Sequence, residues 1–335
     1  KKYPLEVGFC QCNHLTSINE VSPYERYKKN NYSYTSDNSP VSRNHFHSIA
    51  KKIIKHFKLK KNNSIIEIGS NDGTFLKNIK ELSNADVLGV DPSIYMCKLA
   101  KKKGVKTVSN FFNYKTSKYL KKKYKSFDIL YGANVFNHVD NPKDFLRGCK
   151  EIVKKDGIII LEVPDLESLF ERIGFDTIYH EHRQYFSKDS IIKILHKSDL
   201  KLNKIEKIDY MSGSLRFYVK NCPAIKIKIK NRQKKHLKNF IKFKKNISLV
   251  KIEIMNFINE CKKNNQVLVG LGAATKGNTL LNYCNLKDTE IKCILENSKY
   301  KIGKFTPGSG IPIVDEKKFK KYNAILILPW NITSH

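Results

Sequence analysis

A short stretch of this sequence, Ile178–Phe186, places several acid–base side chains next to one another. A phenol, a carboxylate and an imidazole occur there at Tyr179, Glu181 and His182. An imidazole can remove a proton from a carbon next to a carbonyl group, and a phenol can stabilise the enolate oxygen that results. We therefore predict His182 as a general base that Glu181 orients, with Tyr179 at the enolate. His180 lies two positions before His182, which is not the spacing of a helical zinc site. The alternative is a helix start with surface charges.

A second stretch, Ser64–Phe75, reads as an apolar strand, a loop with glycines and the start of a helix. Gly69 and Gly73 allow the backbone to come close to a ligand. No Lys-Ser/Thr pair follows Gly73, so the loop is not a phosphate-binding P-loop. Glu67 within the strand would repel phosphate and suits a cationic ligand. The next strand ends at Asp91, about 20 residues further on, where a carboxylate can bind both hydroxyls of a ribose.

A ligand with a ribose and a positive charge but no phosphate is S-adenosylmethionine (SAM). The sequence therefore predicts a SAM site, built from Glu67, Gly69, Ser70, Asn71, Asp72, Gly73, Asp91, Pro92 and Asn134. Asn134 and His138 belong to the loop after a further strand, which would lie over the transferred methyl group. His138 is the competing candidate for the base. The alternative for the glycine loop alone is an ordinary strand–turn–helix with structural glycines.

Strands and helices alternate around these stretches, which predicts a doubly wound parallel sheet with helices on both faces, an α/β fold. The expected strands are Ser64–Ile68, Asp86–Val90, Phe127–Tyr131 and Gly157–Val163, and the expected helices are Arg43–Phe57, Thr74–Leu82, Tyr95–Lys102, Pro142–Lys154 and Ser187–Leu195. Lys201–Ile208 and Ser214–Lys220 are expected to form an edge hairpin that carries Arg216, a candidate substrate-binding residue. Residues 1–42 show little periodic structure.

A long lysine-rich helix is expected over Asn231–Asn264, as a connector packed on one face or as a helix on a membrane surface. A second α/β pattern follows, with strands at Gln266–Gly270, Glu290–Leu295 and Ala324–Leu328 and a helix at Lys276–Tyr283. Its glycines only partly match a dinucleotide fingerprint. We predict a Rossmann-like domain in which Lys276 and the helix start near Asn278 bind a diphosphate, or else a purely structural domain.

The chain has 63 Lys+Arg against 31 Asp+Glu in 335 residues, a formal net charge of +32. Nearly all the basic residues are lysines spread over the whole chain, which favours a solvated surface over a nucleic-acid interface. The eight cysteines stand mostly alone, which indicates a reducing compartment. No secretory signal or membrane-spanning run is apparent, so a cytoplasmic location is expected.

Several motifs together resemble one family, the SAM-dependent sugar C-methyltransferases of nucleotide-linked deoxysugar biosynthesis. The resemblance rests on Val21–Pro23, Tyr32–Ser36, Glu67–Gly73, Val90–Pro92, Asn134–His138, Phe175–His182, Gly272–Cys284 and Leu328–Asn331. It implies a small zinc-binding N-terminal module, a class I SAM domain and a C-terminal α/β domain. It also implies methyl transfer to the carbon beside the ketone of a nucleotide-linked keto-sugar. Tyr179, Glu181 and His182 match the family's active-site motif, with His138 nearby.

The sequence departs from the family pattern at three places. The zinc module normally has two Cys pairs, whereas here Cys10 and Cys12 are the candidate zinc ligands. Asp165 replaces an aromatic residue, and Met211–Arg216 replaces a usual His-Gly-Gly-Ser-Leu-Arg. The expected division is 1–42 for the remnant of the N-terminal module, 43–222 for the SAM domain, 223–265 for a helical connector and 266–335 for the C-terminal substrate domain. The rival functions are O-methylation of a sugar and non-catalytic binding of nucleic acid.

Overall fold

The computed structural model describes residues 3–10, 14–18, 21–28, 34–224 and 232–330. The chain divides into two compact units. The sheet unit comprises Val7–Leu166 and Arg183–Arg232, and the C-terminal unit comprises Lys1–Glu6, Glu167–His182 and Gln233–His335. This division differs from the predicted boundaries in one important segment. Glu167–His182, which carries the predicted base, packs with the C-terminal part of the chain instead of the SAM domain that surrounds it in sequence.

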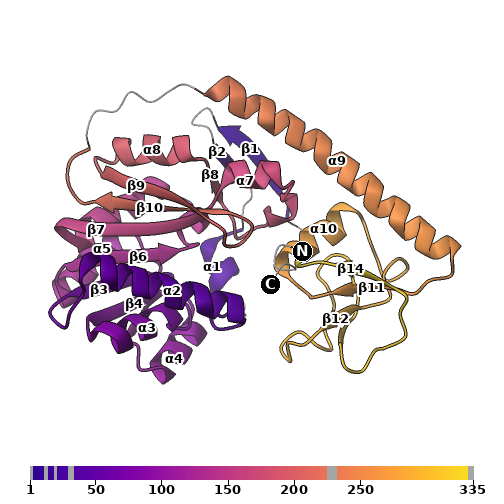
Figure 1. Cartoon of the computed structure of the whole chain (residues 1–335), viewed down its shortest axis with the longest axis horizontal. Coiled ribbons are helices and arrows are strands. Elements are labelled where there is room, and N and C mark those ends of the chain that lie inside the picture. Colours follow the sequence, from indigo (N-terminus) through magenta and orange to yellow (C-terminus); the bar gives the residue numbers. More distant parts are fainter. Residues whose placement is uncertain (1–2, 11–13, 19–20, 29–33, 225–231, 331–335) are drawn as a thin grey trace. The chain divides into compact units, whose positions relative to one another are not determined.

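The centre of the sheet unit is a seven-stranded sheet with the strand order β5-β4-β3-β6-β7-β10-β9 (Figure 1). The strands are β3 Ser64–Ile68, β4 Asp86–Asp91, β5 Thr107–Ser109, β6 Phe127–Ala133, β7 Val153–Pro164, β9 Lys201–Ile208 and β10 Ser214–Lys220. The first five in that order run parallel, and β10 is antiparallel to both of its neighbours, β7 and β9. The order reverses between β3 and β6, and ligands of such sheets bind outside the carboxyl ends of the strands at this point. The predicted doubly wound sheet of a class I methyltransferase is confirmed.

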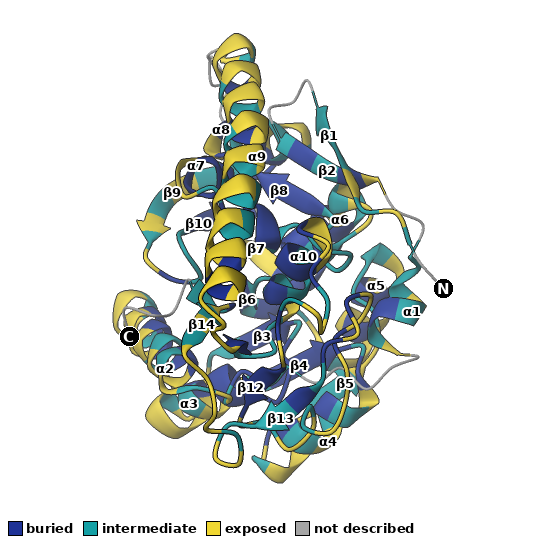
Figure 2. Cartoon of the chain, turned by 90° about the vertical axis from the view of Figure 1, so that its right-hand side faces the viewer, coloured by how far each residue is buried: buried dark blue, intermediate teal, exposed yellow. Residues whose placement is uncertain are grey.

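Two apolar layers enclose this sheet. One face packs against α2 Pro40–Phe57, α3 Thr74–Ser83 and α4 Ile94–Lys102. The other face packs against α5 Tyr114–Tyr124, α6 Pro142–Ile152 and α8 Lys188–Lys197. In α2 the buried side chains recur with helical spacing at Phe46, Ile49, Ala50 and Ile53, so one stripe of the helix meets the sheet. Figure 2 shows the inner strands as the most buried elements of this unit.

The N-terminal segment contains elements that its sequence did not reveal. The structure has β1 Glu6–Cys10, β2 His14–Ile18 and α1 Pro23–Tyr27, where little regular structure was expected. β1 and β2 form a three-stranded sheet with β8 Gln184–Phe186. A pairing of His14 with Phe186 cannot be read from a local pattern. The start of α1 could have been found, because Ser22 and Glu25 form a capping box.

The C-terminal unit combines the long helix α9 Gln233–Lys263 with a four-stranded parallel sheet (Figure 1). The sheet order is β13-β12-β11-β14, from β11 Leu268–Leu271, β12 Ile294–Glu296, β13 Ile313–Asp315 and β14 Ala324–Ile327. The unit also contains α10 Thr275–Tyr283, the 3-10 turn η2 Phe175–Thr177 and nearly all of α7 Leu166–Glu171. The ring of Phe170 on α7 lies 5.0 Å from that of Phe243 on α9. Among the described helices, none is long and apolar enough to cross a membrane.

A buried polar cluster joins β6, β7, β10 and α2 in the sheet unit. The Glu162 carboxylate is inaccessible to solvent and accepts hydrogen bonds from Tyr131 Oη at 2.9 Å and Arg216 Nε at 2.7 Å. Nε2 of His45 lies 2.8 Å from its other oxygen. Burial opposes ionisation of Glu162, but the hydrogen bonds and charges of His45 and Arg216 outweigh it and hold the pKa of Glu162 below its usual value. The buried charge of Glu162 is therefore compensated by its partners, and these contacts hold β6, β7, β10 and α2 together near the carboxyl end of the sheet.

Arg216→Met should destabilise the sheet unit by about 3–5 kcal/mol, because it leaves the Glu162 carboxylate buried without its main cation. Urea denaturation followed by circular dichroism measures the loss. Lys121→Met is the matched control, since Lys121 pairs with Glu151 at the surface and such pairs contribute about 1 kcal/mol or less. Equal losses in the two variants would contradict the role given to the cluster.

Candidate active site

The loop between β3 and α3 turns tightly at the carboxyl end of the sheet. Gly69 and Gly73 have φ values of 70° and 77°, in the left-handed region that favours glycine. Asn71 also lies there, with φ 49°. The amide of Gly69 donates to Val90 O at 2.8 Å, which ties the loop to the end of β4. The predicted glycine loop thus has the backbone form that a close ligand requires.

Asp91 is the last residue of β4 and is 6% exposed. Its carboxylate accepts the amide of Asn71 at 2.9 Å on Oδ2 and the amide of Ser93 at 2.8 Å on Oδ1. Each oxygen retains a second lone pair for a ligand hydroxyl. Burial raises the pKa of Asp91 to about 6, because it outweighs the two amide hydrogen bonds, which favour the ionised form. Asp91, the residue predicted to bind the ribose, is therefore joined by a hydrogen bond to the loop that carries the two glycines.

Three buried polar atoms at this edge of the sheet lack a hydrogen bond among the described residues: Glu67 Oε2, Ser70 Oγ and Asn134 Oδ1. Glu67 is 3% exposed, and burial together with the nearby carboxylates of Asp72, Asp91 and Glu162 raises its pKa well above the usual value. A cation placed here would relieve this repulsion. The donor set therefore fits SAM, whose sulfonium and amino groups are positive and whose other groups are polar.

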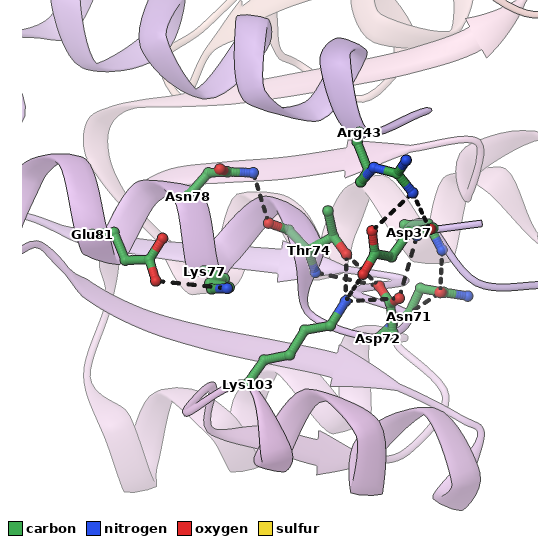
Figure 3. A network of polar contacts seen from close by, with 10 residues as sticks. Asp37, Arg43, Asn71, Asp72, Thr74, Lys77, Asn78, Glu81 and Lys103 are labelled. Carbon is green, nitrogen blue, oxygen red and sulfur yellow. Dashed lines mark hydrogen bonds and ion pairs between the residues drawn. The ribbon is translucent and has the colours of Figure 1, made fainter. Parts of the chain in front are cut away.

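The side chains of Asn71 and Asp72 hold a neighbouring segment, residues 34–37, which we call the N-terminal strap (Figure 3). Asn71 Oδ1 accepts the amide of Ser36 at 2.9 Å, and its Nδ2 donates to Tyr34 O at 3.0 Å. Asp72 Oδ2 accepts the amide of Asp37 at 3.3 Å. Both residues were predicted to bind cofactor; their side chains bind the strap, and their role toward SAM stays a prediction.

Lys103 joins the strap to the loop (Figure 3). Its ammonium lies 3.0 Å from Asp72 Oδ2, 3.2 Å from Asp37 Oδ2 and 2.8 Å from Thr74 Oγ1. No local pattern in the sequence distinguishes Lys103 from the many other lysines. Lys103 directly follows α4, and it comes close to the glycine loop only when the chain is folded.

His138 lies on the 3-10 turn η1 Phe136–His138, directly after β6. Nδ1 of its ring contacts Tyr27 Oη, so α1 helps to orient this candidate base. Arg26 Nη1 donates to His138 O, and its Nη2 donates to both carboxylate oxygens of Asp140 at 2.8 and 2.9 Å. Arg183 Nε reaches the same carboxylate at 2.8 Å. The N-terminal helix, which the sequence did not reveal, therefore positions the loop that was predicted to lie over the methyl group.

The predicted base, His182, lies in a turn of the C-terminal unit. Its amide donates to Tyr179 O at 3.0 Å, and Tyr179 Oη lies 2.7 Å from His182 Nε2. The side chain is 6% exposed, and burial lowers the pKa of His182 to about 3, with a further lowering by the Lys276 charge. A hydrogen bond to the backbone of Thr177 acts in the opposite direction, as expected when the ring donates. The imidazole is therefore neutral, and its Nε2 lies within hydrogen-bond distance of the Tyr179 hydroxyl.

The remaining predicted site residues lie as follows. Arg216 bonds to Glu162 and lies 3.6 Å from Glu206, both carboxylates of the chain itself. Lys276 and Asn278 belong to the first turn of α10, where Asn278 Oδ1 is buried without a hydrogen bond among the described residues. Pro92 directly precedes Ser93, the N-cap of α4, and Glu181 is half-buried in the turn before His182. The roles predicted for these residues stay predictions.

Cys10 is half-buried at the end of β1, and Cys12 lies outside the described residues. Within the described ranges, no group of three or more His, Cys, Asp or Glu side chains could hold a metal ion. The predicted zinc site thus has no further described ligand.

Comparison with known proteins bears on the activity of the whole chain. A family model described as "Methyltransferase domain" matches residues 41–205, and one described as "C-methyltransferase C-terminal domain" matches residues 213–335. C-methyltransferase NovU of Streptomyces niveus is 25% identical over 342 residues, covering 98% of this chain and 81% of that protein. The chain is a SAM-dependent C-methyltransferase.

Other relatives match the methyltransferase over about half of its length. The ubiquinone biosynthesis O-methyltransferase of Pelagibacter ubique is 25% identical over 178 residues, which is 48% of this chain and 74% of that protein. The solved structure of magnesium protoporphyrin IX methyltransferase (ChlM) from Synechocystis PCC 6803 with bound SAH covers 53% of this chain and 82% of its own, at 13% identity and a TM-score of 0.43.

The affinity of the methyltransferase for SAM should depend on pH through Asp91. The ionised carboxylate accepts ribose hydroxyls, and its protonation as the pH falls through about 6 removes that acceptor. The ionised fraction falls about tenfold between pH 7 and pH 5, so calorimetry should show about tenfold weaker binding at pH 5. Asp91→Ala should lose about 1.5–3 kcal/mol per hydrogen bond at pH 7 and most of the pH dependence. Unchanged affinity and pH dependence in Asp91→Ala would rule out the assignment.

Lys103→Met should weaken SAM binding, because the loop loses the ammonium that ties Asp72 to the strap. Loss of one charge-assisted hydrogen bond corresponds to about tenfold in affinity. Lys77→Met is the matched control, since Lys77 pairs only with Glu81 one turn along α3 in Figure 3. If calorimetry gives the same SAM affinity for both variants, the strap does not support the cofactor loop.

Proposed function

We infer that this methyltransferase adds a methyl group to the carbon next to the ketone of a nucleotide-linked keto-deoxysugar, with His182 as the general base. The observation that carries this proposal is the pairing of a neutral, buried imidazole with a phenol in the turn Tyr179–His182. An unactivated carbon has no lone pair with which to attack a methyl group. A base must first remove a proton beside the ketone, and an oxyanion partner must stabilise the enolate.

The donor would be held in the sheet unit by the backbone of Gly69–Gly73, by Asp91 and by the buried polar atoms of Glu67, Ser70 and Asn134. Bound SAM supplies an electrophilic methyl group on a sulfonium. The protein would exclude water from this edge of the sheet, and the Asp91 carboxylate and the strap would hold the loop in place. Because Asn134 and His138 follow β6 at the strand-order reversal, they are the residues proposed to adjoin the acceptor carbon.

The C-terminal unit would supply the proton transfer. In the structure Tyr179 Oη and His182 Nε2 lie 2.7 Å apart, within hydrogen-bond distance of each other. We propose that a bound keto-sugar separates this pair, so that Nε2 takes the proton from carbon while the Tyr179 hydroxyl donates to the enolate oxygen. His182 needs no prior deprotonation, since its pKa of about 3 keeps it neutral near pH 7. Its low basicity makes stabilisation of the enolate by Tyr179 more important.

Methylation of a sugar hydroxyl is the second candidate function, favoured by the match to an O-methyltransferase over about half of the chain. That reaction needs a base for an O–H group but no partner for an enolate oxygen. The family model that matches residues 213–335 is described as a C-methyltransferase C-terminal domain, whereas the O-methyltransferase matches less than half of the chain. C-methylation is therefore the proposal that accounts for both units.

The test is exchange of solvent deuterium into nucleoside-diphosphate-linked keto-deoxysugars that differ in their base and ketone position, incubated without SAM. The wild-type protein should exchange the proton beside the ketone of at least one of them, as followed by proton NMR. His182→Asn should slow this exchange by about 10²–10⁴-fold, the usual contribution of a general base, while SAM affinity is unchanged.

His138→Asn is the matched control, because it removes the competing imidazole from the loop after β6. It should retain most of the exchange. Exchange that persists in His182→Asn and disappears in His138→Asn would reverse the two roles. No exchange in the wild-type protein, together with a methoxy product when SAM is added, would show that the enzyme methylates oxygen.

A further inference from the structure

Three segments that lie far apart in the sequence meet at Asp176 in the C-terminal unit. Asp176, in the turn η2, is 1% exposed, and its Oδ2 accepts a hydrogen bond from Trp330 Nε1 at 2.7 Å. The Lys276 ammonium lies 3.5 Å from the same oxygen and 4.1 Å from the centre of the Trp330 indole ring. An ion pair and a cation–π contact thus hold one lysine from two sides. We call these three residues the Asp176 cluster.

The cluster is one end of a continuous contact between α10 and the segment before the predicted base. Lys276, Thr279 and Tyr283 are spaced i, i+3 and i+7, so they share one face of the helix. Thr279 Oγ1 donates to Ile178 O at 3.1 Å, and the Tyr283 ring lies 5.1 Å from the Phe175 ring. This face of α10 is therefore the support on which residues 175–178 rest.

The supported segment leads directly into the turn of the predicted base. The amide of Ile178 donates to Phe175 O at 2.9 Å, and the amide of His182 donates to Tyr179 O at 3.0 Å. Any shift of η2 on α10 would therefore move the turn that holds His182. Tyr179, which follows Ile178, would move with it.

The charge of Lys276 has a cost that an apolar contact would avoid. Burial lowers the pKa of Lys276, although Asp176 partly compensates, and burial raises the pKa of Asp176. Asp176 Oδ1 is buried without a hydrogen bond among the described residues. Apolar residues could hold two segments together at lower cost, so stability alone does not account for the pair. Its positive member acts on His182, whose protonation it disfavours.

We propose that Lys276, held by Asp176 and Trp330, is a positioning residue that fixes the turn carrying the Tyr179–His182 pair. This role is an alternative to the diphosphate-binding role that the sequence predicts for Lys276. The inference rests on the proposed function, because it assigns a role toward the proposed base. Lys276 acts through the turn, without taking part in proton transfer.

The first experiment needs no substrate. Nitrogen-15 NMR of histidine-labelled protein reports which ring nitrogen of His182 carries the proton, with the signals assigned from His182→Asn. The wild-type ring should show a single tautomer with Nδ1 protonated and Nε2 accepting. Lys276→Met should give a mixture of tautomers, and Lys276→Arg should keep the wild-type spectrum. An unchanged His182 spectrum in Lys276→Met would overturn the inference.

The second experiment uses the deuterium exchange of a keto-deoxysugar that the wild-type protein accepts. Lys276→Met should lower the maximal exchange rate by about 100-fold, the usual cost of a misplaced catalytic group, with little change in the substrate concentration at half-saturation. Lys276→Arg should recover most of the rate. Lys262→Met, which breaks an exposed pair with Glu290, is the matched control and should exchange at the wild-type rate. A raised half-saturation concentration with an unchanged maximal rate would show instead that Lys276 binds the diphosphate.

Folding is checked in the same variants. Lys276→Met alone leaves Asp176 buried without its cation, so the double variant Asp176→Asn/Lys276→Met is measured beside it. Trp330 is the only tryptophan of the chain, so its fluorescence reports on the cluster directly. A double variant that retains wild-type fluorescence, exchange and tautomer would overturn the inference. Failure of the wild-type protein to exchange any keto-sugar would refute the proposed function, and the NMR result would still decide the role of Lys276.

Discussion

The Asp91 carboxylate is the point on which the carboxyl edge of the large sheet depends. Its two oxygens accept the amides of Asn71 and Ser93, so one buried side chain fixes both the glycine loop and the start of α4. The same burial raises its pKa to about 6, as carboxylates gather here with few cations between them. A polar, positively charged molecule bound at this edge would reduce the repulsion among these carboxylates. SAM has this character. The Asp91 carboxylate that holds the glycine loop and the start of α4 is thus also the group predicted to bind the SAM ribose.

Burial shifts a pKa in the opposite direction in the C-terminal unit, because the buried group there is an imidazole, whose charged form is the protonated one. It removes the positive form of His182, so that a neutral ring lies against the Tyr179 hydroxyl. A ring so weakly basic needs help from its surroundings to take a proton from carbon. The Asp176 cluster and α10 supply a rigid position, and Tyr179 supplies a donor for the enolate. The proposed chemistry thus relies on preorganisation more than on intrinsic basicity.

The sequence was sufficient for the elements that are long, apolar and bounded by clear breaks. β3 and the β9–β10 hairpin were predicted with their observed bounds, whereas α2 begins three residues earlier than expected because Ser39 caps it ahead of Pro40. β5 has only three residues and α5 is mostly lysine and tyrosine, so neither has a periodic apolar pattern to detect. The site was predicted in part for the same reason. Glycines and Asp91 mark the cofactor loop locally, but the bonds from Asn71 and Asp72 to the strap, and from Asp176 to Trp330, join residues 35 or more positions apart.

The central claim is that the acceptor atom is carbon, activated by loss of a proton beside a ketone. The most direct measurement is the NMR spectrum of the product formed from SAM with a carbon-13-labelled methyl group and a nucleotide-linked keto-deoxysugar. The account predicts that the labelled methyl carbon couples to a neighbouring sugar carbon, with the ketone retained at the next position. A labelled methyl group bound to oxygen would contradict it.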